Sequence, residues 1–345
     1  MSILRKKEGQ KGDLKDIFLI YNFLKFLVFA TLFILYGRMF FSKLDSWDTT
    51  YYVCISEHGY SSIQEYVFSP IYPFLIKLFD LPFPKSNFWI VLSGVIVTNL
   101  FGEGFVYLVY RYWGYKNTLI VAIFPIFVLY STIPYSDSIF LFFLALFLTT
   151  GEVVSIISYC VSLGLFFNLA YTIPSLYFRY KNKLLIIIPL IVGFVILFFY
   201  WRYLGSPMSY FSLEKRYWGA QFETPIAQEE SIMSSTFHYG LPSILYLVRN
   251  YLIEALFIAG TFIMYKKRLR NWKFLIFYTL SIEIPLLFIV GVPEFSLPRL
   301  ILPAFPALFS YSAYLRNRLR VSIYIITCSI FTILFTAWQF ISFFA

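Results

Sequence analysis

The chain has 345 residues, of which 59% are hydrophobic and 13% are charged, and its formal net charge is +10. A water-soluble core cannot absorb that much apolar surface, so the composition excludes an ordinary soluble domain and predicts an all-α polytopic membrane protein. Most basic residues lie at the ends of apolar runs, where the positive-inside rule places them, so the charge indicates topology and not nucleic-acid binding. The three cysteines are scattered and predict neither a disulfide framework nor a metal site.

The amino-terminal segment MSILRKKEGQKGDLKD is basic and leads into a long apolar run. No small-residue cleavage site follows it, which predicts a retained first helix and a cytoplasmic amino terminus. Lys25 lies some two turns into this helix, and we expect its side chain to snorkel to the cytosol.

Apolar runs long enough for membrane helices recur along the chain, because a bilayer core about 30 Å thick needs about 20 residues per helix. They cover residues 17–41, 88–112, 119–130, 139–149, 153–178, 184–203, 244–265, 274–292, 300–315 and 321–344. Basic clusters between these runs should face the cytosol. An odd number of runs separates two of the clusters, and an odd number of membrane crossings cannot return the chain to the side that it left. One run must therefore be two short helices, and Asn168 and Pro174 favour a break in 153–178. About eleven helices result, with a range of about 9–12.

This topology places two long loops, residues 42–87 and 205–243, on the extracytoplasmic face. The short turns 131–138 and 293–299 lie on the same face. Internal repeats and Pro/Gly/Ser linkers are not visible in the sequence, so we predict one transmembrane domain over residues 1–345.

The first loop carries the candidate chemistry. Trp47 and Asp48 follow the first helix closely, so the Asp48 carboxylate should lie near the membrane surface and could accept the proton of an attacking hydroxyl. Spacing alone favours a solvated or helix-capping aspartate at position 48, and Asp45 is interpreted as a cap. Gly59 should end a helix in a left-handed turn.

Five ordered blocks of sequence resemble the PIG-V-type (GPI mannosyltransferase 2-like) family of the GT-C glycosyltransferase superfamily. The blocks are Trp47-Asp48 with Ile55 to Tyr60, Phe68 to Pro73, Pro134 to Ser138, Gly205 to Pro207 with Tyr217 to Gly219, and Leu297 to Leu300 with Leu302 to Pro306. Four positions depart from the family pattern: Ser69, Asp137, Ser206 and Leu300. Asp137 keeps the charge of the usual Glu, whereas Ser206 removes a carboxylate.

The resemblance implies a GT-C-type bundle whose long first loop contains short interfacial helices. It implies inverting transfer of a sugar, most simply mannose, from a polyprenyl or dolichyl phosphate donor to a hydroxyl of a glycolipid or glycan acceptor. By matching motif, Asp48 is the catalytic residue. The compact chain favours the cell membrane of a prokaryote, in particular an archaeon, and the endoplasmic reticulum membrane if the source is eukaryotic. The resemblance also leaves room for a small membrane subunit as partner, besides membrane lipids.

Several basic and polar residues are candidates for binding substrate. Arg299 has a planar guanidinium that suits a lipid phosphate, although an arginine at a helix end also snorkels to the interface. Lys215 and Arg216 are secondary phosphate candidates or solvated residues. Asp137 either orients the acceptor or sugar, or caps the helix that begins near Ser138.

Asn168 either hydrogen-bonds a sugar or satisfies backbone freed by the helix break. Tyr60, Tyr72 and Trp218 are candidates for stacking on a sugar or isoprenoid chain. Trp47 is also predicted to bind substrate. Aromatic residues make up 23% of the chain, so packing and interface roles remain open for each.

Carboxylates also lie within apolar runs, at Glu103, Glu254 and Glu283. Such groups are costly in a membrane, so each has either a functional role or a partner such as Arg or Tyr in the bundle. The sequence has no D-x-D motif and no His/Asp cluster with ligand spacing, so we expect neither a metal nor a cofactor, and a divalent cation that bridges phosphate and carboxylates stays the alternative. A secondary transporter and a noncatalytic lipid-binding membrane subunit remain alternative functions.

Overall fold

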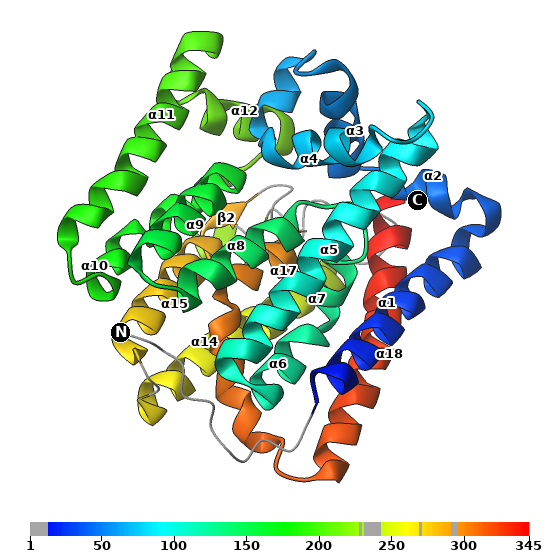
Figure 1. The fold of residues 1–345 in the computed structure, drawn as a ribbon, viewed down its shortest axis with the longest axis vertical. Coiled ribbons are helices and arrows are strands. Elements are labelled where there is room, and N and C mark those ends of the chain that lie inside the picture. Colours follow the sequence, from blue (N-terminus) through cyan, green and yellow to red (C-terminus); the bar gives the residue numbers. More distant parts are fainter. Residues whose placement is uncertain (1–12, 228–229, 231–242, 269–270, 291–295, 345) are drawn as a thin grey trace. The chain divides into compact units, whose positions relative to one another are not determined.

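The computed structural model of the protein (Figure 1) describes residues 13–227, 230, 243–268, 271–290 and 296–344. These residues are almost entirely helical, which confirms the predicted all-α class. They divide into two compact units. The first contains the described residues up to Leu165 with Tyr311–Phe340, and the second contains Phe166–Ser310 with the described residues from Ile341.

The first unit is built around the long helix α5 (Asn87–Trp113), which packs against α4 and α8. Helix α1 (Leu14–Tyr36) packs against α6 and α7, and α8 packs against α9. The remaining elements are η1 (Gly37–Met39), α2 (Phe40–Leu44), α3 (Asp48–His58), η2 (Ile63–Val67), α4 (Ile71–Asp80), α6 (Tyr115–Ala122), α7 (Pro125–Tyr130), α8 (Asp137–Thr149), α9 (Glu152–Leu165) and most of α18 (Arg318–Phe344).

The second unit contains an antiparallel pair of two-residue strands, in which Gln221 lies opposite Val290. Helices α14 and α15 pack against each other, and α15 also packs against η3. Its elements are η3 (Phe167–Ser175), α10 (Leu176–Arg179), η4 (Lys183–Ile186), α11 (Ile187–Leu204), α12 (Ser209–Trp218), β1 (Gln221–Phe222), α14 (Ser243–Lys267), α15 (Trp272–Leu286), β2 (Ile289–Val290), α17 (Leu297–Leu300) and most of η5 (Leu302–Tyr314).

Four helical segments of the described chain are long and apolar enough to cross a membrane. They are Leu14–His58, Asn87–Trp113, Lys183–Leu204 and Arg318–Ile341. The chain is therefore a helical protein with the segments needed for membrane integration. The count of about eleven spans stays a prediction.

Glycines end the first helix and the helix of the first loop. Gly37 has a φ of 54° at the end of α1, a conformation that side chains other than glycine rarely adopt. Gly59 has a φ of 71°, and its N–H donates to the Ile55 carbonyl oxygen at 2.9 Å. The predicted helix end at Gly59 is confirmed, whereas its ψ of -166° differs from that of the predicted left-handed turn. The predicted first loop contains the short helices α3, η2 and α4.

The predicted break in the apolar run 153–178 is present. Helix α9 ends at Leu165, and the following η3 is a 3-10 helix that contains Asn168 and Pro174. Proline has no N–H to donate, so an α-helical hydrogen-bond pattern cannot continue through it. The apolar run 300–315 was predicted as a span of the same kind as the others. It forms the 3-10 helix η5 with a kink at Ala304, because prolines interrupt it at Pro303 and Pro306.

Lys25 does not snorkel to the cytosol, so that prediction is wrong. Its side chain is buried, and Nζ lies 2.9 Å from Oε1 of Glu103 on α5. Nζ also lies 4.1 Å from the centre of the Tyr21 ring, whose hydroxyl donates to Ser131 Oγ at 2.7 Å. A carboxylate on the neighbouring helix neutralises the lysine, so the side chain has no need to reach the membrane surface.

The two other carboxylates of apolar runs lie in the second unit. Glu283 on α15 is 1% exposed, and its Oε1 accepts a hydrogen bond from Thr261 Oγ1 at 2.8 Å. Thr261 Oγ1 also lies 3.1 Å from Thr279 Oγ1. Within the described part of the chain, Oε2 of Glu283 and Oε1 of Glu254 are buried without a hydrogen-bond partner. A threonine therefore holds Glu283, in place of the predicted Arg or Tyr.

Candidate functional site

The predicted site residues are distributed over both units. Those in the first unit are Trp47, Asp48, Tyr60, Tyr72 and Asp137, and those in the second are Asn168, Lys215, Arg216, Trp218 and Arg299. Asp48 and Arg299 belong to different units, so their placement on the same face of the membrane stays a prediction.

Asp48 is the first residue of α3, and Trp47 before it has a φ of 61°. A positive φ is uncommon for a residue other than glycine, and such strain persists only where the surroundings impose it. The turn is closed by the amide of Thr50, which donates to the Trp47 carbonyl oxygen at 3.1 Å. The half-buried Asp48 thus lies in the first helical turn, where the helix dipole stabilises a carboxylate.

Asp45 ties the start of α3 to the start of α5. Its Oδ2 accepts a hydrogen bond from Asn87 Nδ2 at 2.7 Å, and its carbonyl oxygen accepts one from Thr50 Oγ1 at 3.2 Å. Asp45 follows α2 directly, and its carboxylate bonds to the start of α5 and does not cap α3. Asp45 thereby has a structural role, which separates it from Asp48.

Helix α3 is fastened to the turn that carries Asp137. Thr49 Oγ1 donates to the Pro134 carbonyl oxygen at 3.1 Å, and the hydroxyls of Tyr52 and Ser136 lie 2.9 Å apart. Thr49 and Tyr52 are both buried. Thr49 and Tyr52 therefore both bond to the loop segment that directly precedes Asp137.

Asp137 is the first residue of α8 and is only 4% exposed. At this position the helix dipole favours its negative charge. The negative charge of Asp137 also acts on Tyr72 in α4. Burial raises the pKa of the Tyr72 hydroxyl well above its ordinary value, and the negative charge of Asp137 adds to the increase. Tyr72 consequently stays protonated and acts as a hydrogen-bond donor beside the turn.

A second layer of hydroxyl groups supports the turn from α4 and α5. The hydroxyl of Tyr72 donates to the Gly94 carbonyl oxygen at 3.0 Å and lies 2.8 Å from Thr98 Oγ1. Thr98 in turn donates to the Tyr135 carbonyl oxygen at 2.9 Å. The Tyr72 ring is fully buried. It packs against the Tyr52 ring in a T-shaped arrangement, with a centroid distance of 4.8 Å. A role in stacking on a sugar does not fit that burial.

We expect Tyr72→Phe to lower the free energy of unfolding by about 1–2 kcal/mol, because the buried Gly94 carbonyl oxygen loses its donor and the Thr98 hydroxyl loses its contact with the phenol oxygen. Thermal unfolding in detergent micelles measures the change. Tyr107→Phe is the matched control, since Tyr107 is exposed on the same helix that Tyr72 contacts. Equal melting temperatures for both variants would contradict the supporting role of Tyr72.

Glu65 closes the end of the loop between α3 and α4. Its carboxylate accepts hydrogen bonds from the amide of Ser62 at 3.0 Å and from Oγ of Ser61 at 3.0 Å. Burial by itself raises the pKa of Glu65, but these donors together with the Ser61 amide outweigh it and lower the pKa below its ordinary value. Tyr60 closes the same loop, because its hydroxyl donates to the Phe68 carbonyl oxygen at 2.7 Å.

A lowered pKa predicts a pH-dependent contribution to stability. The stabilisation by Glu65 is fully present above the ordinary pKa of a glutamate, about 4.3, and is lost as the pH falls through the lower folded-state value. The melting temperature of the wild type should therefore exceed that of Glu65→Gln near neutral pH, and the gap should close in acid. A gap that does not change between neutral and acidic pH would refute this role.

In the second unit, Arg299 lies in the short helix α17 after Pro298 and is half-buried. Its guanidinium carbon lies 5.8 Å from the centre of the Phe166 ring, which is a cation–π distance. Asn168 is half-buried in η3, two residues after that ring. The start of η3 and the arginine are therefore neighbours within this unit.

The other second-unit candidates lie at the end of α12. Lys215 and Arg216 are exposed in its last turn, where cations also stabilise the helix dipole. The Arg216 guanidinium lies 5.4 Å from the Tyr217 ring centre. Trp218 is half-buried with its ring 5.9 Å from that of Tyr217, and Gly219 ends the helix with a φ of 63°.

Thr49, Tyr52, Thr98 and Ser136 are the site residues that sequence reasoning missed. The spacing of Thr49 and Tyr52, three residues apart, places both on one face of a helix and is the signal that could have found them. Within the described residues, no three or more His, Cys, Asp or Glu side chains gather where they could hold a metal ion. Comparison with protein-family models, with curated proteins and with solved structures found no match.

Proposed function

We propose that this chain is an inverting glycosyltransferase, and specifically a mannosyltransferase. It moves the sugar of a polyprenyl or dolichyl phosphate-linked donor to a hydroxyl of a glycolipid or glycan acceptor on the extracytoplasmic face. The observation that carries the proposal is the placement of Asp48 in the first turn of α3, a helix fastened through Thr49 and Tyr52 to the turn of Asp137. The ordered PIG-V-like blocks support the same assignment.

In this mechanism the Asp48 carboxylate takes the proton of the acceptor hydroxyl as its oxygen attacks the anomeric carbon. The bond between that carbon and the lipid phosphate breaks, and the phosphate oxygen leaves with the bonding electrons. Attack opposite the leaving group inverts the anomeric centre. Arg299 supplies the cation that offsets the growing phosphate charge, a role that its planar guanidinium suits.

The proposal also includes the membrane topology of the chain. We assign the chain a GT-C-type bundle of about eleven membrane helices with a cytoplasmic amino terminus. The half-buried Asp48 and the buried Asp137 then lie at the extracytoplasmic surface, where a donor phosphate and an acceptor headgroup are both found. A base close to that surface can reach a hydroxyl of a membrane-bound acceptor.

The test uses the purified full-length chain in vesicles that contain polyprenyl phosphate mannose and a glycolipid extract as acceptor. We expect consumption of the donor, formation of a mannosylated product and an inverted anomeric configuration. A product with retained configuration would exclude the mechanism. Transport of sugar into the vesicles without product would instead favour a transporter, and an unconsumed donor would favour a noncatalytic subunit.

A further inference from the structure

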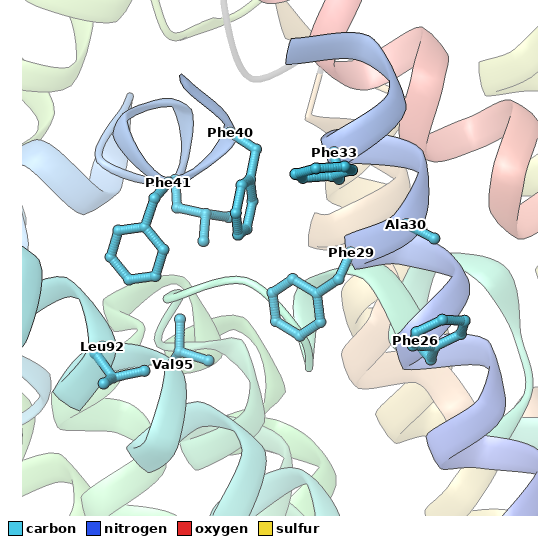
Figure 2. A pocket seen from close by; sticks show the side chains of 9 residues that line it. Phe26, Phe29, Ala30, Phe33, Phe40, Phe41, Leu92 and Val95 are labelled. Carbon is cyan, nitrogen blue, oxygen red and sulfur yellow. The ribbon is translucent and has the colours of Figure 1, made fainter. Parts of the chain in front are cut away.

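Two internal features of the molecule have no part in the proposed function. One is an apolar pocket of about 360 Å³ in the first unit, where the rings of Phe29, Phe33 and Phe40 face a common space (Figure 2). Every residue that lines this pocket is apolar, so it offers no polar group that would identify an occupant. The other feature is the carboxyl group of Glu283 in the second unit, which is buried and hydrogen-bonded. The contacts of Glu283 identify what it binds.

Glu283 begins a row of three oxygen-bearing side chains between α15 and α14. Its Oε1 lies 2.8 Å from Oγ1 of Thr261 on α14, and that Oγ1 lies 3.1 Å from Oγ1 of Thr279, one turn before Glu283 on α15. The Thr279 hydroxyl shares its proton between two carbonyl oxygens of α15, at 3.0 Å for Leu275 and 3.1 Å for Ile276. All three side chains of the row are at most 3% exposed, so protein atoms supply their partners.

The number of protons in this row decides the charge of Glu283. Each threonine hydroxyl has a single proton. Thr279 gives its proton to its own helix, so the proton between the two threonines comes from Thr261. The contact between Thr261 and Glu283 then has a proton only if the carboxyl group carries one. A distance between two oxygen atoms does not show which of them holds the hydrogen, and 2.8 Å fits donation by a protonated carboxyl group as well as donation by Thr261.

The second carboxyl oxygen of Glu283 favours the same protonation state. Oε2 is buried and has no hydrogen-bond partner among the residues that the structure describes. A carboxylate spreads its negative charge over both oxygens, so an ionised group buried in this way is strongly destabilising. In a protonated carboxyl group Oε2 is a neutral carbonyl oxygen, which costs much less to leave unpaired.

The surroundings of Glu283 contain titratable groups but supply no paired cation. Helix α15 packs against α14, η3 and α10. On the face of α14 that carries Thr261, Glu254 lies seven residues earlier and Tyr265 four residues later. The other charged residues of these four elements, with the tyrosines that are not exposed, are Tyr171, Arg179, Arg249, Lys266, Lys267, Lys273 and Tyr278. In the described part of the chain, none of the cations forms an ion pair with Glu283.

We infer that Glu283 is a proton-binding site, at which the carboxyl group holds a proton in the native protein and donates it to Thr261. Thr261 then donates to Thr279, and Thr279 donates to the backbone of α15. The proton keeps the buried carboxyl group neutral, and the row of hydrogen bonds fastens α15 to α14. The inference is independent of the proposed sugar transfer, because no residue of the row has a part in that reaction.

The test is infrared spectroscopy of the purified full-length protein near neutral pH, where a protonated carboxyl group and a carboxylate have separate bands. The difference between the spectra of the wild type and Glu283→Gln should contain the band of a protonated acid. Glu223→Gln is the matched control, since Glu223 is exposed in the same unit and an exposed carboxyl group is ionised near neutral pH. Its difference spectrum should contain carboxylate bands alone. The same result for Glu283→Gln would overturn the proposal.

Melting temperatures in detergent micelles give a second readout. Glutamine is neutral at every pH and its amide N–H can donate to Thr261, so Glu283→Gln should melt like the wild type in acid. It should melt above the wild type as the pH rises, because the unfolded wild type loses its proton at Glu283 more readily than the folded protein does. A lower melting temperature for Glu283→Gln near neutral pH would contradict the proposal.

Thr261→Val keeps the proposal testable if Glu283→Gln does not fold. It removes the acceptor of the proton, so the acid band should move and the melting temperature should fall by about 2–4 °C. An unchanged acid band in Thr261→Val would overturn the row of hydrogen bonds. A carboxylate band for Glu283, together with a wild-type melting temperature that rises with sodium concentration, would identify a bound cation and overturn the proton.

Discussion

Replacing Asp48 with asparagine is expected to lower the rate of sugar transfer by about two to four orders of magnitude, which is the contribution of a positioned general base. Asparagine has nearly the size of aspartate but cannot take a proton from the acceptor hydroxyl. Helix α3 should remain in place, because Thr49 and Tyr52 make its contacts with the turn of Asp137. The measurement is the initial rate in vesicles with polyprenyl phosphate mannose at a saturating concentration.

Asp45→Asn is the matched control for this experiment. Asp45 lies three residues before Asp48 in the same loop, and its Oδ2 accepts a hydrogen bond that the amide oxygen of asparagine can also accept. The control should therefore transfer sugar at close to the wild-type rate. A comparable loss in both variants would indicate that charge in the loop, and not a base at position 48, supports transfer.

The second large effect concerns stability. Lys25→Met should lower the free energy of unfolding by about 3 kcal/mol, the lower end of the cost of breaking a buried ion pair. The lower end applies because 31% of the Glu103 side chain is exposed, whereas that of Lys25 is 5% exposed. Methionine fills much of the same space, so the loss comes chiefly from the Glu103 carboxylate left without its cation. Thermal unfolding in detergent micelles provides the measurement.

The double variant Lys25→Met, Glu103→Leu separates charge from packing. Removing both charges leaves no uncompensated carboxylate, so most of the lost stability should return. If the double variant melts as low as Lys25→Met, or if Lys25→Met melts like the wild type, the ion pair does not have the assigned role.

Local features of the fold followed from the sequence. Gly59 ends a helix with positive φ, and the interruption around Asn168 and Pro174 divides an apolar run, because both effects are properties of the backbone at those residues. The backbone of the run 300–315 departs from an α-helix for a related reason. Its apolar composition resembles a span, but Pro303 and Pro306 favour the 3-10 geometry of η5.

Features that join distant segments could not be predicted in the same way. Lys25 and Glu103 are separated by 78 positions, and an isolated lysine in an apolar helix is reasonably expected to snorkel. The contacts of Thr49 and Tyr52 with the turn of Asp137 likewise span more than 80 positions. The sequence identified Asp48 and Asp137 as separate candidates, and only tertiary packing brings their segments to one junction.

The most direct test of Asp48 as the base is a single-turnover reaction with polyprenyl phosphate mannose already bound to an excess of protein. The wild type should form mannosylated product in one rapid phase. Asp48→Asn should bind the donor with unchanged affinity and form product at least about a hundredfold more slowly. Product formation by Asp48→Asn at the wild-type rate would contradict the assignment.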